Sequence, residues 1–250
     1  MIPINHPRYH SLMIREKLVE GFEKDIVARE GLIAHGRGEA FDYLIGEKTI
    51  EPALKSINAA SAHFILAKHP VISVNGNVAA LCAKEISELS QSLEKLSVEV
   101  NLFYHTLSRE KAITNELKKY GIKKILGIDS NRSVQIPEPE SNRRKIDSEG
   151  IFIADTVFVP LEDGDRTIAL KKMGKKVITV DLNPLSRTSI ASDISIIDNI
   201  IRVFPMLIKN IEDHKKNSTI KDLENIINNY NNKETMKECL RIIRLGSNTT

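Results

Sequence analysis

The run Val71-Ile72-Ser73-Val74-Asn75-Gly76-Asn77 decides the fold, because it is a short β-rich segment that stops at a glycine and leads into a helix. Asn77 is expected to cap that helix, which continues to about Leu93. The same alternation recurs downstream. Further strands are expected at 98–103, 124–128, 156–160, 177–180 and 194–197, and further helices at 108–120, 165–173 and 199–213. Strands that alternate with helices predict an α/β protein with a mostly parallel sheet flanked by helices.

The chain on either side of this alternation is predicted to be helical. Ahead of it, helices are expected at 7–26, 39–45 and 52–68, the second opened by a turn at Gly36-Arg37-Gly38. Residues 129–150 hold prolines and many polar residues, and are interpreted as a long loop. We predict one α/β domain over residues 1–216, including the N-terminal helices. A helical tail over 217–250 is expected to pack on this body or on a second subunit.

Composition excludes several classes of protein. The 250 residues are 41% hydrophobic and 28% charged, which suits a soluble domain with a sizeable core. A net charge of only +3 and the absence of tryptophan do not suit a protein that binds nucleic acid. The longest uncharged run, 69–83, is shorter than the ~20 apolar residues of a membrane span. We therefore expect a cytoplasmic protein that binds neither nucleic acid nor membranes, with Cys82 and Cys239 as neutral thiols.

Polar residues follow three of the predicted strands. They are Asn75-Gly76-Asn77, the acidic turn at 161–167, and Asp181-Leu182-Asn183. Because the carboxyl ends of parallel strands meet at one edge of a sheet, ligands bind there. Asp181 stands at the end of its strand, where a carboxylate can hold a sugar hydroxyl.

Three arginines lie beside glycines or helix starts, namely Arg15, Arg37 and Arg187. A guanidinium is permanently charged, and its planar donors fit the oxygens of a phosphate. Together with Asp181, these arginines predict a nucleotide site, and hence an enzyme that uses a nucleotide.

Each motif also has a purely structural interpretation. Gly36-Arg37-Gly38 is not a dinucleotide fingerprint, because the third glycine falls on Phe41 and no strand precedes it. Alone, it is as typical of a structural turn as of an anion site. In the acidic turn, Asp163 and Asp165 suit a hydrated Mg²⁺ or a proton acceptor, but Asp165 is also a good helix cap. The junction at 75–77 suits either a phosphate or a capped helix.

Metal and acyl-enzyme chemistry find no support in the sequence. His35 and His105 lie next to polar turns without partners at metal-ligand spacing, so they are expected to be surface or satisfied side chains. We predict no metal site built from protein ligands. Neither a Gly-x-Ser-x-Gly elbow nor a Cys/His nucleophile pattern occurs.

Five blocks of the sequence resemble one family, in the same order along the chain. They are residues 14–21, 31–44, 74–77, 159–167 and 181–187, which read IREKLVEG, GLIAHGRGEAFDYL, VNGN, VPLEDGDRT and DLNPLSR. These blocks are similar to those of the archaeal phosphopantothenate synthetases, also called 4-phosphopantoate–β-alanine ligases.

The resemblance implies an ATP-dependent ligase of coenzyme A biosynthesis. Such an enzyme joins 4-phosphopantoate to β-alanine through an acyl-adenylate and releases AMP and diphosphate. A Rossmann-like sheet and a homodimer are also implied, and we expect Mg²⁺ to accompany the ATP. The ATP contacts of the family fall here on Arg15, Arg37, Asp181, Leu182, Asn183, Arg187, Thr188, Asp198 and Asn199.

The chemistry of these residues suggests individual roles that agree with the resemblance. Arg15 and Arg37 would neutralise the charge that develops during adenylation, Asp181 would hold the ribose, and Asn183 would offer its amide to the nucleotide. Asp163 or Asp165 is the candidate base that takes a proton from β-alanine. The phosphate of 4-phosphopantoate is assigned to Asn75, Gly76 and Asn77 together with Arg8 or Arg166.

Two other functions stay open at this stage. One is a non-catalytic nucleotide-binding or sensor protein on a Rossmann-like sheet. The other, an oxidoreductase of the NAD type, is weaker because the third glycine of its fingerprint is missing.

Overall fold

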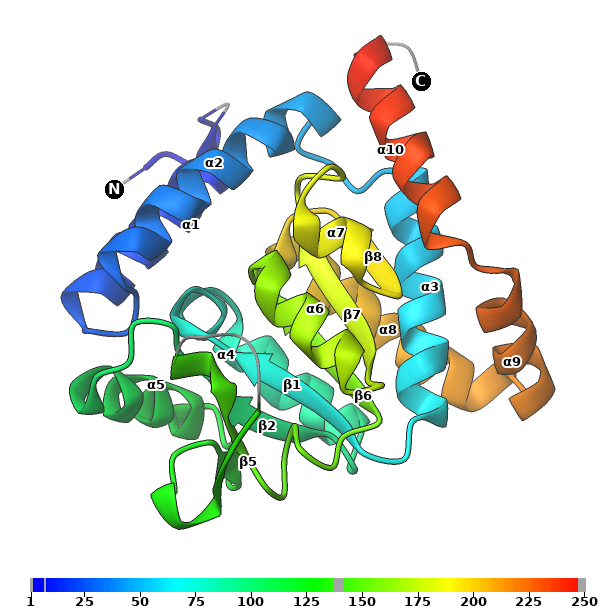
Figure 1. Cartoon of the computed structure of the whole chain (residues 1–250). Coiled ribbons are helices and arrows are strands. Elements are labelled where there is room, and N and C mark those ends of the chain that lie inside the picture. The colour runs from blue at the N-terminus through cyan, green and yellow to red at the C-terminus, as the bar shows by residue number, and fades with distance from the viewer. Residues whose placement is uncertain (1, 7, 137–141, 247–250) are drawn as a thin grey trace.

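A six-stranded parallel sheet forms the centre of the molecule, as predicted (Figure 1). The computed structural model describes residues 2–6, 8–136 and 142–246. The strand order is β3-β2-β1-β6-β7-β8, and every neighbouring pair is parallel. In that order the strands span Ile125–Leu126, Ser97–Val100, Pro70–Val74, Thr156–Pro160, Lys176–Asp181 and Ile194–Ile197. All six lie where the sequence predicted them, although β2 and β3 are shorter than expected.

The order of the strands reverses between β1 and β6. β1 leads through α4 (Gly76–Ser92) to β2 on one side, and β6 leads through α6 (Gly164–Lys172) to β7 on the other. Ligands of such sheets bind in the crevice that opens at the reversal, beyond the carboxyl ends of the strands. The two strand ends are joined here, because Asn75 donates from Nδ2 to the carbonyl of Leu161 at 2.9 Å.

Helices cover both faces of the sheet. One face packs against α3 (Glu51–Leu66), α4 and α8 (Ile200–Asn217), with α5 (Leu107–Lys119) against α4. Phe158 of β6 lies between Phe64 of α3 and Phe204 of α8, with ring centroids 5.5 and 5.7 Å apart. The other face packs against α6. Because both faces are covered, the central strands are apolar throughout rather than alternating.

The glycine-rich segment at 36–38 is not a turn, which corrects the sequence prediction. α1 spans Tyr9–Glu23, and α2 runs without interruption over Arg29–Ile45, straight through these glycines. A glycine costs a helix interior only about 1 kcal/mol, which tertiary contacts of a long helix outweigh. The backbone instead turns between the two helices, where Asp25 has a positive φ of 59°. Position 7 of the first expected helix lies outside the described residues.

The predicted loop at 129–150 is also partly wrong. Within it, β4 (Ser133–Gln135) pairs antiparallel with β5 (Lys145–Asp147), and short 3-10 helices span Ser130–Arg132 and Asn142–Arg144. Residues 137–141 of this segment lie outside the described part of the chain. The prediction also missed a five-residue helix, α7 (Arg187–Ala191), between β7 and β8.

Two helix caps differ from those expected. Asn75, rather than Asn77, caps α4 by accepting the amide of Val78 at 3.1 Å. Asp163, rather than Asp165, caps α6 by accepting the amide of Arg166 at 2.9 Å. In both helices a glycine follows the cap as the first helical residue, so each helix starts earlier than the sequence indicated.

The tail folds into two helices, as predicted. α9 (Ile220–Asn229) and α10 (Asn232–Leu245) pack on α3 and β8 of the same chain (Figure 1). The hydroxyls of Tyr230 and of Ser56 in α3 share a hydrogen bond of 3.0 Å. Oδ1 of Asn232 accepts a hydrogen bond from the amide of Ser195 in β8 at 2.8 Å. Across the described residues, no helix has the length and apolarity that crossing a bilayer requires.

Candidate functional site

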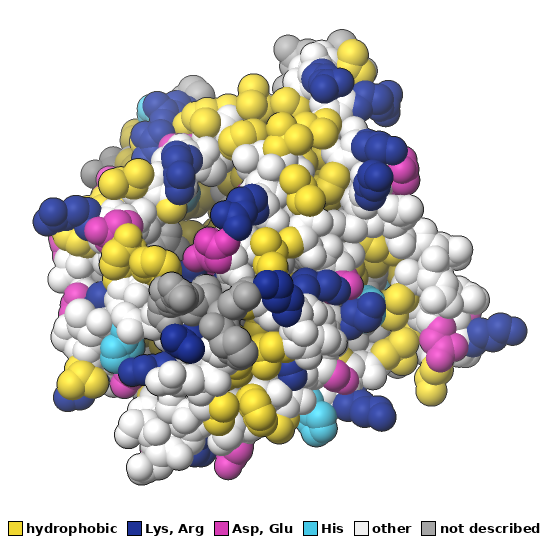
Figure 2. Space-filling view, in the orientation of Figure 1, with side chains coloured by type: hydrophobic (Ala, Val, Ile, Leu, Met, Phe, Trp, Pro, Cys, Tyr) yellow, Lys and Arg dark blue, Asp and Glu magenta, His cyan; other side chains and the backbone are white. Residues whose placement is uncertain are grey.

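A cavity of about 640 Å³ lies at the carboxyl ends of β1, β6 and β7. One of its walls is α2, which stands away from the sheet in Figure 1, and Figure 2 shows the surface hollowed between that helix and the body. Most of the site residues proposed from the sequence line this cavity. They are Arg37, Asn75, Gly76, Asn77, Asp163, Asp181, Leu182, Asn183, Arg187, Thr188 and Asn199. The other five, Arg8, Arg15, Asp165, Arg166 and Asp198, lie outside its walls.

The end of β7 forms a compact polar turn. Asp181 accepts the amide of Asn183 at 2.9 Å and the hydroxyl of Ser186 at 2.5 Å. Burial raises the pKa of Asp181 despite these hydrogen bonds. Thr188 donates from its hydroxyl to the carbonyl of Glu162 at 2.9 Å, which joins this turn to the one after β6. The carboxylate at the strand end is therefore fixed before any ligand arrives.

Two arginines of the cavity differ in their surroundings. Arg37 of α2 is exposed, and in the described part of the chain its side chain has neither an ion pair nor a hydrogen bond. Arg187 forms an ion pair with Asp165 at the exposed rim. That pairing also explains why Asp165 does not face the cavity. Arg37 is thus the guanidinium most available to an anion.

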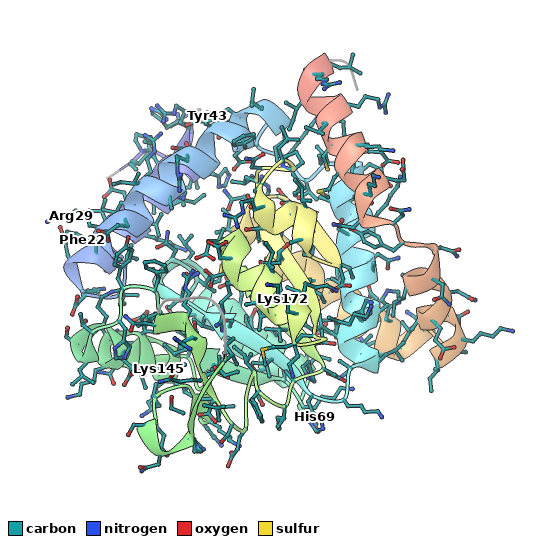
Figure 3. All side chains as sticks on the ribbon, in the orientation of Figure 1. Phe22, Arg29, Tyr43, His69, Lys145 and Lys172 are labelled. Carbon is teal, nitrogen blue, oxygen red and sulfur yellow. The ribbon has the colours of Figure 1, made fainter. Side chains whose placement is uncertain are left out.

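Arg15 of α1 is held by a carboxylate of α2 and does not line the cavity. Its guanidinium donates to both carboxylate oxygens of Glu39, the shortest contact being 2.7 Å. Tyr43, labelled in Figure 3, also donates to Glu39, at 3.0 Å. Burial raises the pKa of Glu39, but its bonds to Arg15 and Tyr43 outweigh burial and leave that pKa lowered. The expected contact between Arg15 and ATP therefore stays a prediction.

Asp198 and Asn199 connect the end of β8 to α2. Asp198 is fully buried and accepts from Nε of Arg202 at 2.7 Å, and burial raises its pKa against the effect of that arginine. Asn199 lines the cavity and donates to the carboxylate of Asp42 in α2 at 2.8 Å. Arg202 also pairs with Asp42. Asp42 and Arg202 were missed because nothing local distinguishes them: Asp42 stands within the block at 31–44 but was given no role, and Arg202 lies outside all five blocks.

The start of α4 lies close to the loop between α1 and α2. A Cβ on Gly76 would come within 2.2 Å of the carbonyl oxygen of Ile26, so glycine is required there. Asn77 donates from Nδ2 to the carbonyl of Gly31 in α2 at 2.9 Å. This contact closes α2 against α4 and bounds one end of the cavity.

The acidic turn after β6 is neutralised by an arginine that the sequence analysis did not single out. Arg143 is buried, lines the cavity, and forms ion pairs with Glu162 and Asp163. Asp163 uses its other oxygen to cap α6. Both carboxylate oxygens of Asp163 are thus occupied, one by the guanidinium of Arg143 and the other by the first turn of α6.

The two arginines expected beside the phosphate of 4-phosphopantoate lie elsewhere. Arg166 has no exposed surface, and its guanidinium donates to the carbonyl of Arg143 below the cavity wall. Arg8 contacts the hydroxyl of Tyr43 at 3.2 Å and is not part of the wall. We therefore do not retain either of them as a substrate contact.

Two further residues of the cavity wall carry unsatisfied groups. Arg109 of α5 is buried, and its Nε has no partner. His35 of α2 also lines the cavity, and its buried Nε2 has no partner, so the expectation of a satisfied histidine is wrong. Burial lowers the pKa of His35. Only the tertiary structure shows these features, because nothing in the local sequence marks either residue.

No group of three or more His, Cys, Asp or Glu side chains placed to hold a metal ion occurs within the described ranges. Cys82 and Cys239 are free and buried, as expected for neutral thiols. Burial raises the pKa of Cys82 and brings that of Cys239 to about 12.

Comparison with known proteins places the chain in a family. The family model described as phosphopantothenate/pantothenate synthetase matches residues 52–246, which include every strand of the main sheet. A protein of Thermococcus kodakarensis named 4-phosphopantoate–beta-alanine ligase is 54% identical over 244 residues, covering 97% of this chain and 92% of that protein. A protein of the same name from Methanosarcina mazei is 46% identical over 243 residues, covering 97% and 94%.

Proposed function

The chain belongs to the phosphopantothenate/pantothenate synthetase family and is a 4-phosphopantoate–β-alanine ligase of coenzyme A biosynthesis; from that premise we propose how its cavity carries out the reaction. ATP binds at the end of β7, and 4-phosphopantoate binds toward the end of β1. The observation that carries this assignment is that one cavity contacts both strand ends.

The reaction we propose has two steps. First, a carboxylate oxygen of 4-phosphopantoate attacks the α-phosphorus of ATP, the bond from that phosphorus to the bridging oxygen breaks, and diphosphate leaves. Second, the amine of β-alanine attacks the acyl carbon of the adenylate, AMP leaves, and the amine gives up a proton. Holding both substrates in one cavity supplies the orientation that the first step needs.

The nucleotide half of the site rests on the turn after β7. Asp181 accepts a hydrogen bond from the ribose, since its carboxylate is already oriented by Asn183 and Ser186. Arg37 and Arg187 face the phosphates, with the backbone of Leu182 and the hydroxyl of Thr188 beside them. Arg37 neutralises the charge that moves onto the leaving diphosphate, an effect that reaches about 3 kcal/mol for one good donor.

The remaining residues at the family's ATP-contact positions are Asp198, Asn199 and Arg15. Asn199 and Asp198 hold α2 and the end of β8 together through Asp42 and Arg202. Glu39 already occupies Nε and Nη2 of Arg15, so we expect the contribution of Arg15 to be smaller than that of Arg37.

Asp163 is the proposed acceptor for the proton of β-alanine. It is the only one of the two carboxylates put forward from the sequence that lines the cavity. Its carboxylate is already paired with Arg143, so the unpartnered Nε2 of His35 is the competing acceptor.

Mg²⁺ is expected to enter with ATP, bound by the phosphates. The donor set fits this arrangement better than a protein-bound ion, because Glu162 and Asp163 are already paired with Arg143. When bound, the ion supplies charge neutralisation on the phosphates.

A homodimer in the cytoplasm completes the proposal. Large apolar side chains are exposed near the cavity rim, among them Leu44 of α2 at 47% and Ile190 of α7 at 67%. Figure 2 shows such side chains gathered over the C-terminal end of α2 and toward α10. A patch of this kind is typical of a subunit interface. Two buried free cysteines fit a reducing compartment.

Product analysis tests the proposed function. Purified protein with ATP, Mg²⁺, 4-phosphopantoate and β-alanine should form AMP and diphosphate in equal amounts. Chelation of Mg²⁺ should stop the reaction, and light scattering should give twice the mass of one chain. If the protein binds ATP but never forms AMP, it is a nucleotide-binding sensor instead.

A further inference from the structure

Arg109 is a buried cation without a carboxylate partner. Its side chain is attached to α5, and its guanidinium donates to the carbonyls of Tyr104 and Ile26, the latter at 3.0 Å. Only 8% of the residue is exposed, and Nε has no partner. Within the described residues no carboxylate forms an ion pair with it. The charges of Asp25 and Glu30 act on it only from beyond ion-pair distance, so much of the cost of burying this cation remains, and an anionic ligand would offset that cost.

The guanidinium of Arg109 lies directly against the start of α4. A Cβ built on Gly76 would be 2.8 Å from its Nη2, so the bare backbone of this glycine is what admits the cation. Asn75 accepts the amide of Val78 with its side chain, and its carbonyl accepts the amide of Ala79. The amides of Gly76 and Asn77 have no hydrogen bond to any described residue.

These groups have the composition of a phosphate site. The first amides of a 17-residue helix carry the positive end of its dipole, and a fixed guanidinium beside them adds a full charge. Arg109, Gly76 and Asn77 all line the cavity. The site is therefore open to the same space as the nucleotide end.

The distance between the two ends suits the acid substrate. β6 alone separates β1 from β7, so the two strand ends are about 10 Å apart. The carboxylate and the phosphorus of 4-phosphopantoate are roughly 6 Å apart at ordinary bond lengths. With its phosphate at α4, the acid reaches toward the α-phosphate of an ATP held at β7. Leu81, Leu102 and Leu161 line the cavity and offer apolar contacts to the two methyl groups between.

We propose that Arg109, with the backbone amides of Gly76 and Asn77, binds the phosphate of 4-phosphopantoate and so selects the phosphorylated acid. This inference rests on the proposed function. Arg143 is the nearest rival, but Glu162 and Asp163 already neutralise it. Arg166 has no access to the cavity, and Arg37 and Arg187 belong to the nucleotide end.

The first test compares two acids. In Arg109→Gln, kcat/KM for 4-phosphopantoate should fall about 100-fold, as expected when one partner of a buried charged contact is removed. The slow reaction with pantoate, which lacks the phosphate, and the KM for ATP should not change. Arg109→Lys should recover part of the loss, and Arg29→Gln, an exposed arginine of α2, is the control. Equal losses with both acids would show a structural role and overturn the proposal.

The second test removes one amide without touching Arg109, in case Arg109→Gln does not fold. Asn77→Pro lacks the backbone N–H but suits the first turn of a helix, whereas Asn77→Ala keeps it. Both lose the contact with Gly31, so they form a matched pair. The proline variant alone should raise the KM for 4-phosphopantoate. Identical KM values for the two variants would exclude the amide.

A binding measurement separates this proposal from the proposed function. Inorganic phosphate should raise the melting temperature of the wild-type protein, and Arg109→Lys should weaken that shift. Inorganic phosphate should also compete with 4-phosphopantoate and not with ATP. If AMP never forms but phosphate still stabilises the protein through Arg109, the reaction is wrong and the anion site stands. If AMP forms but phosphate neither competes nor stabilises, the site is wrong and the reaction stands.

Discussion

Asn199, at the end of β8, donates a 2.8 Å hydrogen bond from Nδ2 to the carboxylate of Asp42 in α2, 157 residues away in the sequence. The same carboxylate pairs with Arg202 of α8. α2 carries Arg37 over the cavity, so this buried contact fixes the height of that arginine above the sheet end.

Replacement of Asp42 tests this connection. Asp42→Ala leaves Arg202 with one carboxylate instead of two and frees the amide of Asn199. The free energy of unfolding should fall by about 3 kcal/mol in urea denaturation. The KM for ATP should rise as well, because the helix that carries Arg37 loses an anchor. The stability and the KM for ATP of Asp42→Asn, which keeps one acceptor oxygen, should lie between those of the wild type and those of Asp42→Ala. An Asp42→Ala variant with wild-type stability and an unchanged KM for ATP would contradict the anchoring role.

Arg37→Ala should separate catalysis from stability. The side chain is exposed and has no partner in the described structure, so the free energy of unfolding should stay within about 0.5 kcal/mol. Loss of one donor to the phosphates should lower kcat/KM for ATP on the order of 100-fold in a diphosphate-release assay. Arg29→Ala, on the outer end of the same helix in Figure 3, should change neither quantity. Wild-type kinetics for Arg37→Ala would remove this arginine from the site.

Two glycines should respond in opposite directions to alanine. A Cβ on Gly36 meets nothing within 4 Å, so Gly36→Ala should raise the free energy of unfolding by about 0.5–1 kcal/mol through helix propensity. A Cβ on Gly76 meets a backbone carbonyl and Arg109, so Gly76→Ala should lower it by about 1–3 kcal/mol. Thermal unfolding of both variants measures the difference. Stabilisation by both substitutions would show that α4 does not approach residue 26 as described.

The proton acceptor can be identified from pH–rate profiles. Asp163→Asn keeps an oxygen that can cap α6 but removes the carboxylate, so kcat for the amine step should fall on the order of 100-fold. His35→Gln should leave kcat and its pH dependence nearly unchanged. If kcat instead falls in His35→Gln and not in Asp163→Asn, the imidazole of His35 is the proton acceptor.

Glu99 should make stability depend on pH. It is fully buried, and burial raises its pKa to about 7 against the amides of Ile151 and Asp147 and the charge of Arg166. The folded protein thus holds this proton up to about pH 7, whereas the unfolded chain releases it near 4.5, its ordinary pKa. The Glu99 contribution to stability is therefore complete below pH 4.5 and is lost as pH rises to 7, by about 3 kcal/mol.

Urea denaturation between pH 4.5 and 8 checks that dependence. Glu99→Gln removes the titrating group and should flatten the fall in stability that the wild type shows on going from pH 4.5 to 7. A variant whose stability falls as steeply as that of the wild type would show that another group titrates.

The sequence was sufficient for the elements whose signal is local. Apolar strands punctuated by Asn75 and Asp181 located both the sheet and the edge where ligands bind, since parallel strands end together. The residues of the cavity that directly follow the end of a strand were identified from the sequence. The Gly36-Arg37-Gly38 segment was misjudged because a glycine pair favours a turn locally, and only the packing of α2 decides otherwise.

What the sequence could not show depends on distant contacts. Arg109 and Arg143 look like surface charges on or near a helix, and nothing local reveals that both become buried in the cavity wall. Arg166 was misplaced because its burial is decided by the packing of α6 against the segment at 142–147. Asp42 and Asn199 were not paired for the same reason.

α2 is held at both ends, by Asn77 against Gly31 and by Asn199 against Asp42. A helix anchored at two points moves less in its middle than a helix anchored at one point, and Arg37 lies between the two anchors. The backbone that carries Arg37 is therefore already in position before charge shifts onto the departing diphosphate, and the chemical step does not have to wait for a loop to order itself.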